Sequence, residues 1–408
     1  MKNDTWCVNA FHSLCGMNDG TTKPCCMYNF NDDVSYPVLG VNPISDHMKF
    51  PEFVEVREAL SSGVQHERCK RCWDEERAGI TSKRMIDNRV YREHVENTRK
   101  PFKGLAKVEL NLGNTCNIKC RTCHPSTSST WMKEHHDLYV KEQHHQTYKQ
   151  FTQVYSRFYK HYEEQSPFWE DIENHLDTIK QFDFYGGEPF MSKKMWALIE
   201  TAYKKGYASD ISLQYNSNTT LWPEQGGIEY WKYFKHVNLN FSVDGIEKQF
   251  ELMRHPAKWD IALENMNKAV SLKNQNGNMH VGWCITLSTL NIFYLPETLK
   301  FFYENFEDFG LYLNLVHGPR HYNISIMPES VKQKVQEKLE DFINKFDFKN
   351  DRENGKQQII GVLNFMNNNS SDENEWENFK TAIETHDSYR KEDYYNTFPE
   401  FGELIKAK

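Results

Sequence analysis

Apolar and polar residues alternate along six short segments in the middle of the chain. The segments are 107–113, 181–187, 210–218, 236–245, 280–288 and 311–318. In 236–245, Leu239 and Phe241 fall on one face, and Asn238 and Asn240 fall on the other. A period of two is typical of a β-strand with one apolar face. The pattern therefore predicts six strands.

The connections between these segments predict how the strands pair. Most exceed twenty residues and show the apolar spacing of amphipathic helices. Such crossovers are needed between parallel strands. A closed eight-stranded barrel fills its interior with branched aliphatic side chains, which the polar faces here do not supply. We therefore expect an α/β fold, a partial (β/α)6 TIM-like barrel with helices outside and polar residues inside. The alternative is an antiparallel sheet with one face in water.

The regions on either side of this pattern differ in character. Residues 1–100 carry six cysteines and turn-rich text, and residues 331–408 are mostly charged and helical. We expect three domains: an N-terminal cysteine-bearing module over 1–100, a barrel over 101–330 and a helical extension over 331–408. In the long insertion 131–175, six histidines raise the possibility of a metal site. Aromatic residues from Tyr148 to Tyr162 at helical spacing instead favour an amphipathic helix.

Charge and composition narrow the classes of partner. The 408 residues have a net charge of -8, and no basic block stands out, so nucleic acid is not indicated. The first residues lack the pattern of a signal peptide, and no apolar run is long enough to cross a bilayer. We expect a cytoplasmic protein without membrane contact. In that compartment the ten cysteines are kept reduced, and their tight spacing suggests metal ligands rather than disulfides.

Three cysteines follow the first predicted strand. Cys116, Cys120 and Cys123 form a C-x3-C-x2-C loop at the strand end where parallel barrels place their active sites. An iron–sulfur cubane takes one thiolate per iron, so three thiolates leave one iron open to another ligand. The alternative is a structural zinc site, which needs a fourth ligand such as His124.

This loop resembles that of the radical S-adenosylmethionine (SAM) enzymes. In that family a 4Fe-4S cluster binds the amino and carboxylate groups of SAM at its open iron. The aromatic residue that usually precedes the last cysteine is replaced here by Thr122. The resemblance implies two cofactors, the SAM-binding 4Fe-4S cluster and SAM itself. It covers roughly residues 104–320.

Other motifs match the same family in the same order. "GGEP" ends the second predicted strand, "NSNTT" follows the third, and "SVDG" with "FELMRHP" follows the fourth. The glycines allow close approach of the backbone to a ligand. The resemblance implies that these motifs contact SAM. The residues concerned are Gly186, Gly187, Glu188, Pro189, Asn218, Ser242, Asp244 and Arg254.

The N-terminal cysteines resemble another module. Their spacing and the text "CxxCWxxExxG" are similar to the auxiliary-cluster modules called SPASM and twitch domains. The resemblance implies an auxiliary 4Fe-4S cluster in electron transfer, on Cys7, Cys25, Cys69 and Cys72. Cys26 or Cys15 could substitute for Cys25 or Cys7. A four-cysteine zinc site is the alternative.

Together these features predict a radical SAM enzyme that abstracts hydrogen from a polar substrate. A peptide or protein, or a sugar or nucleotide, fits the polar interior. Cys284, alone on the polar face of the fifth strand, is a candidate hydrogen-atom donor, whereas a lone cysteine is usually a small buried residue. The family implies an electron donor such as flavodoxin or ferredoxin. The alternative function is a non-catalytic iron–sulfur or zinc protein that transfers electrons.

Overall fold

The computed structural model describes residues 5–77, 81–96, 104–141, 147–223, 226–348 and 354–406. Contacts divide the chain into two compact units. The first unit comprises residues 1–116, 152–215 and 223–237, and the second comprises 117–151, 216–222 and 238–408. These borders do not coincide with the predicted ones at 100 and 330, and the three-domain organisation stays a prediction.

All six predicted strands are present, with ends within three residues of those expected. They are β3 (Lys107–Asn111), β4 (Gln181–Tyr185), β5 (Ser212–Ser217), β6 (His236–Ser242), β7 (Met279–Leu287) and β8 (Gly310–Leu315). The described residues also contain two short strands that the pattern did not predict. These are β1 (Ser13–Gly16) and β2 (Thr22–Lys23).

Parallel pairing dominates the first unit. Its strands lie in the order β2-β1-β3-β4-β5. β1 pairs in parallel with β3, with Ser13 opposite Lys107, and β3 with β4 and β4 with β5 are also parallel. Of these pairs, only β1 with β2 is antiparallel. The expected α/β class is thus confirmed, and the antiparallel alternative is wrong.

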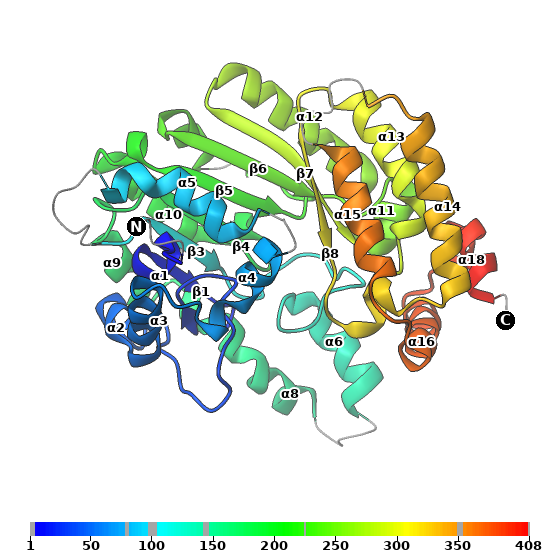
Figure 1. Ribbon diagram of the computed structural model, residues 1–408, viewed down its shortest axis with the longest axis horizontal. Helices are drawn as coiled ribbons and strands as arrows, with labels where there is room; N and C mark the ends of the chain where they lie inside the picture. Colours follow the sequence, from blue (N-terminus) through cyan, green and yellow to red (C-terminus); the bar gives the residue numbers. More distant parts are fainter. Residues whose placement is uncertain are drawn as a thin grey trace. The chain divides into compact units, whose positions relative to one another are not determined.

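Helices of the first unit pack against one another in pairs (Figure 1). α1 lies against α5, α2 against α3, and α9 against α10. An aromatic core that includes Phe53 and Trp73 fills the space among the N-terminal helices. The helices are α1 (Val8–His12), α2 (Ile44–Lys49), α3 (Pro51–Ser61), α4 (Lys70–Arg77), α5 (Lys83–Glu96), α9 (Phe168–Glu173) and α10 (Lys193–Lys204).

The second unit places long helices against β7 and β8 (Figure 1). β7 and β8 are parallel, with Cys284 opposite Tyr312; α12 packs on β7 and α15 on β8. α14 falls where the charged C-terminal periodicity predicted a helix. The helices are α6 (Met132–His135), α11 (Glu247–Met253), α12 (Trp259–Gln275), α13 (Leu295–Asn305), α14 (Glu329–Lys345), α15 (Gly355–Asn367), α16 (Glu373–Arg390), α17 (Tyr394–Thr397) and α18 (Pro399–Lys406).

The alternation read from the sequence is reproduced in the burial of side chains. Leu239 and Phe241 are fully buried, whereas Asn238 and Asn240 are half-buried and Tyr312 is 60% exposed. Apolar residues on one strand face are removed from water, which is the main favourable contribution to folding. On the opposite face the amide side chains remain accessible, so their polar groups are not buried without a hydrogen-bond partner.

The histidine-rich insertion forms a helix over part of the predicted range. α8 spans Tyr148–Tyr155, and Phe151 on it is buried. His135 stacks on Phe151, with ring centroids 5.8 Å apart. The described part of the insertion is therefore an aromatic packing element. Among all described residues, no three His, Cys, Asp or Glu side chains are grouped so as to hold one metal ion.

Among the described residues, no helix has the length and apolar composition needed to span a membrane.

Candidate functional site

The three-cysteine loop begins directly after β3. Its backbone is paired with the end of α11: the Lys119 N–H donates to the His255 carbonyl at 2.7 Å, and the Arg121 N–H donates to the Met253 carbonyl at 2.8 Å. These two bonds bracket Cys120 on one segment and Arg254 on the other. Tertiary pairing therefore fixes the loop against the residue that follows α11.

Arg254 reaches the sulfur of Cys120. Its Nη1 lies 3.9 Å from Cys120 Sγ, within hydrogen-bonding distance for sulfur. The Arg254 Nε is buried and has no hydrogen-bond partner. A buried guanidinium with an unused donor, next to a cysteine, is suited to hold an anionic group or a thiolate.

Asp244 holds Arg254 in place. Its Oδ2 lies 2.8 Å from Arg254 Nη2, and its Oδ1 accepts from the Thr286 N–H at 3.0 Å. Both carboxylate oxygens are thus engaged within the protein. Burial lowers the pKa of Arg254, but the Asp244 carboxylate outweighs that effect and the pKa stays above its ordinary value. Asp244 positions the guanidinium, which remains charged.

The other two predicted SAM contacts of the second unit lie in hydrogen-bonded turns. Asn218 Nδ2 donates to Asn117 Oδ1 at 2.8 Å, and Asn218 Oδ1 accepts from the Thr220 hydroxyl at 2.7 Å. The carbonyl of Ser242 accepts from the Thr219 hydroxyl at 3.2 Å. These bonds fix the loop after β5 within the second unit.

A glycine turn closes the end of β4 in the first unit. Gly186 and Gly187 have φ of 83° and 50°, a conformation that side chains with a Cβ rarely adopt. A Cβ at Gly186 would lie 1.6 Å from Asn111 Oδ1, and one at Gly187 would lie 2.3 Å from the Thr115 carbonyl. Asn111 Oδ1 is itself buried without a partner. Only glycine fits this backbone, as the sequence motif requires.

Glu188 and Pro189 follow the glycine turn. Glu188 is buried, its N–H donates to the Thr115 carbonyl at 2.8 Å, and its Oε1 accepts from the Phe190 N–H at 3.1 Å. Pro189 begins the short helical turn Pro189–Met191. The carboxylate is therefore held at the strand end by the turn that it caps.

The four N-terminal cysteines predicted as ligands border a single cavity of the first unit. Its volume is about 20 Å³. Cys69 and Cys72 stand at the start of α4, three residues apart, so they lie on one side of the helix. Cys7 precedes α1, and Cys25 lies in the turn closed by the Tyr28 N–H on its carbonyl. Cysteines as far as 65 positions apart in sequence thus share one site.

The two alternative cysteines are engaged elsewhere. Cys26 donates its N–H to Glu109 Oε2 at 3.1 Å, and its Sγ lies 3.8 Å from Glu109 Oε1. Cys15 Sγ lies 3.5 Å from the Tyr185 hydroxyl. Neither lines the cavity. The geometry therefore favours the set that contains Cys25 and Cys7.

The environment of the four thiols resists ionisation unless a metal is bound. Burial raises the pKa of Cys7 and of Cys69 to about 12 and raises those of Cys25 and Cys72 as well. A metal or cluster offsets that cost by binding the thiolates. In a cubane each thiolate binds a different iron, whereas in a zinc site all four thiolates bind the same ion. The four thiols that line this cavity fit a zinc ion or a 4Fe-4S cluster by their chemistry, and as they stand no three of them are grouped tightly enough to hold one metal ion.

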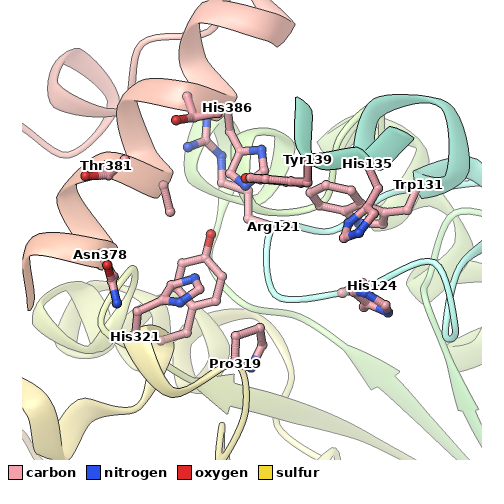
Figure 2. A pocket seen from close by; sticks show the side chains of 14 residues that line it. Arg121, His124, Trp131, His135, Tyr139, Pro319, His321, Asn378, Thr381 and His386 are labelled. Atoms are coloured by element: carbon pink, nitrogen blue, oxygen red, sulfur yellow. The ribbon is translucent and has the colours of Figure 1, made fainter. Parts of the chain in front are cut away.

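A second pocket opens beside the three-cysteine loop, within the second unit (Figure 2). Its volume is about 360 Å³, and Arg121, Cys123 and His124 lie on its border. Figure 2 shows His321 and Asn378 across the cavity from His124. Burial lowers the pKa of His135 to about 4, and those of His124, His321 and His386 are also lowered. The lining is therefore aromatic and largely uncharged at neutral pH.

Cys284 lies on the polar face of β7, as predicted. Burial raises the pKa of its thiol to about 12, and the Asp244 carboxylate adds to the effect. The sulfur is therefore a neutral thiol rather than a nucleophilic thiolate. This protonation state suits donation of a hydrogen atom.

Several residues of these sites were not found from the sequence. Arg121 is fully buried and its Nη2 pairs with Glu392 at 2.7 Å and with Asp387. Lys83 and Arg84 line the four-cysteine cavity. Basic residues in a helical stretch usually lie in solvent, so only the tertiary structure distinguishes them.

No family model matches the chain, and no curated protein matches it. Some solved structures show a distant likeness. One is "Native anSMEcpe with bound AdoMet", at 13% identity and a TM-score of 0.34, over 65% of this chain and 63% of that chain. Another is "Crystal structure of Streptococcus suis SuiB bound to S-adenosylmethionine", also at 13% and 0.34, over 74% of this chain and 60% of that chain.

A third similar structure is SuiB "bound to precursor peptide SuiA", at 12% identity and a TM-score of 0.33, over 71% of this chain and 62% of that chain. The chain thus spans about three fifths of the length of the structures that it matches. At these identities and TM-scores the likeness does not establish the class of this protein. The class of this protein must be inferred from its own residues.

Proposed function

We propose that this chain is a radical SAM enzyme that cleaves S-adenosylmethionine reductively and abstracts hydrogen from a polar substrate. The observation that carries the proposal is the Cys120–Arg254–Asp244 arrangement. A C-x3-C-x2-C loop follows a parallel strand, and a buried, fixed guanidinium touches one of its sulfurs. A zinc or electron-transfer site has no need of an arginine held in this way by a buried carboxylate.

Cys116, Cys120 and Cys123 would hold the first 4Fe-4S cluster. When bound, the cluster and SAM together supply a 5′-deoxyadenosyl radical. Arg254 would stabilise the thiolate of Cys120 by a charge-assisted hydrogen bond, and its unused Nε can meet an anionic group of the ligand. Asp244 keeps the guanidinium oriented and charged.

The motifs after β4, β5 and β6 would bind SAM. Gly186 and Gly187 let the backbone approach a ligand, and Glu188 offers a carboxylate that suits an ammonium group. Asn218 and Ser242 would hydrogen-bond the nucleoside. Cys284 would donate a hydrogen atom to a substrate radical, which its neutral thiol permits.

The half-buried amides of β6 and the exposed Tyr312 of β8 favour a polar substrate, such as a peptide or protein, or a sugar or nucleotide. Amide side chains both donate and accept, so they match hydrogen-bonding groups that are uncharged. Reductive cleavage also requires an electron donor such as flavodoxin or ferredoxin. The protein would act in the cytoplasm, where its thiols stay reduced.

Cys7, Cys25, Cys69 and Cys72 would hold an auxiliary 4Fe-4S cluster in a twitch- or SPASM-like module. With four cysteine ligands no iron is open, so this cluster would transfer electrons rather than bind substrate. The convergence of the four thiols on one cavity supports this assignment over the sets with Cys26 or Cys15.

The test is anaerobic reconstitution with iron and sulfide, followed by dithionite and SAM. We expect a brown protein that forms 5′-deoxyadenosine. A reconstituted, brown protein that forms none would contradict the enzyme assignment and leave an electron-transfer protein. A colourless protein that binds zinc tightly would contradict both clusters.

A further inference from the structure

Two cations border the four-cysteine cavity. Lys83 and Arg84, at the start of α5, are the charged residues among those that line it in the described chain. Their side chains are 17% and 11% exposed, so water screens them only in part. Among the described residues, no acidic side chain lines the cavity beside them.

Each cation is tied to a carboxylate that lies outside the cavity lining. Lys83 Nζ lies 2.7 Å from Glu109 Oε1 and 3.4 Å from Asp87 Oδ2. Arg84 Nη2 lies 2.6 Å from Glu76 Oε2, and the guanidinium lies 4.6 Å from the ring centroid of Trp73. Both positive charges are therefore fixed in position rather than free to swing into solvent.

Glu109 connects the N-terminal segment that holds Cys25 and Cys26 to the sheet. It lies on β3 and is buried; besides Lys83 it accepts the N–H of Cys26, the residue after Cys25. Lys107 Nζ is 3.6 Å from Glu109 Oε1 and 3.2 Å from Asp183 Oδ2. A chain of alternating charges thus runs from the cavity along β3 to β4.

We propose that Lys83 and Glu109 set the reduction potential of the auxiliary cluster, Lys83 raising it and Glu109 lowering it. The inference rests on the proposed auxiliary cluster. Reduction adds one negative charge to the cluster. A nearby buried cation stabilises that charge, and a nearby carboxylate opposes it. Because the two side chains form a pair, each also limits the effect of the other.

Substitutions that remove the two charges should shift the midpoint potential in opposite directions. Lys83→Met should lower the midpoint potential, and Glu109→Gln should raise it. We expect each to change the ratio of reduced to oxidised cluster at a fixed potential by about tenfold, which corresponds to about 59 mV for one electron. Lys83→Arg keeps the charge and should keep the potential. Lys70→Met removes a lysine that is 65% exposed on α4 and should leave the potential unchanged.

The measurement uses the full chain with Cys116, Cys120 and Cys123 replaced by alanine, so that only the auxiliary cluster remains. Its potential is followed by redox titration with electron paramagnetic resonance, and iron is counted in every variant. Opposite shifts support the proposal. Unchanged potentials, shifts of the same sign, or a shift in Lys83→Arg as large as that in Lys83→Met would overturn it.

Failure of the underlying assignment looks different. If the parent triple variant binds no four-iron cluster, the auxiliary-cluster assignment is wrong before any potential is measured. If Lys83→Met loses its cluster, Arg84→Met with Glu76→Gln provides a second pair. The same opposite signs are expected there, because Arg84 and Glu76 repeat the arrangement. Equal signs in that pair would also overturn the proposal.

Discussion

The two cysteine sets differ in how many thiols they offer and in what surrounds them. The N-terminal set has four thiols around one cavity in the first unit, with two fixed cations on its border. The loop after β3 has three cysteines within eight residues, an arginine at one sulfur and a pocket of about 360 Å³ beside another. Four ligands saturate a cubane, whereas three leave a position for chemistry.

Under the proposed function, this difference separates an electron-transfer site from a reactive one. Around the four-cysteine cavity, Lys83 and Arg84 are each paired with a carboxylate. Around the three-cysteine loop, Arg254 retains an unused buried donor. A closed shell suits electron transfer, and an open one suits substrate activation.

The largest expected effect comes from the three-cysteine loop. Cys120→Ala should abolish formation of 5′-deoxyadenosine, because two irons would lack protein ligands. Cys116→Ala and Cys123→Ala should do the same. The assay is anaerobic turnover with dithionite and SAM, with product measured by chromatography. Turnover at the wild-type rate in any one of the three would remove that residue from the ligand set.

The second-largest expected effect distinguishes the four-cysteine set from the three-cysteine set. Cys25→Ala should reduce bound iron from about eight to about four per chain, because one 4Fe-4S cluster is lost. SAM cleavage should persist in this protein. Cys26→Ala is the matched control, since Cys26 contacts Glu109 instead of the cavity. Iron loss in Cys26→Ala with none in Cys25→Ala would reverse the assignment.

A smaller effect is expected at Arg254. Arg254→Met should weaken SAM cleavage by about 10–100-fold, the usual range for a residue that orients a metal ligand. It also leaves the buried Asp244 unpaired, so iron content is measured alongside activity. Lys248→Met is the control, because Lys248 lies on α11, the helix that Arg254 follows, and is 84% exposed. Full activity in Arg254→Met would exclude a role at the cluster.

The subtlest test is spectroscopic. SAM should alter the electron paramagnetic resonance signal of reduced Cys25→Ala, which keeps the three-cysteine cluster. It should leave the signal of Cys120→Ala unchanged, because only the four-cysteine cluster remains there. A SAM-dependent change in Cys120→Ala would mean that the four-cysteine cluster has an open iron.

Much of the fold followed from local pattern. The alternation in 236–245 and its counterparts predicted β3 to β8, because strand periodicity is visible whenever one face is buried. β1 and β2 were missed, since four and two residues are too short to show a period. β1, which lies in the predicted N-terminal module, pairs with β3 within the first unit.

The residues of the candidate site also divide into those that the local sequence indicated and those that it did not. Cys116, Cys120 and Cys123 lie so close in sequence that spacing alone indicated a shared ligand set. The glycine turn was also local, since a tight strand end requires φ values that only glycine adopts readily. The partner of Arg254, by contrast, is 134 positions away in the chain, and no local pattern reveals it.

The sequence by itself determined the parallel α/β architecture, the three-cysteine loop and the residue types available for chemistry. Only the tertiary structure decided that Cys25 rather than Cys26 borders the cavity, that Asp244 holds Arg254, and that Lys83 and Arg84 lie beside four thiols. The physical reason is the distance along the chain over which each kind of interaction acts. Periodicity and turn chemistry act over a few residues, whereas burial and charge pairing depend on which distant segments the fold brings together.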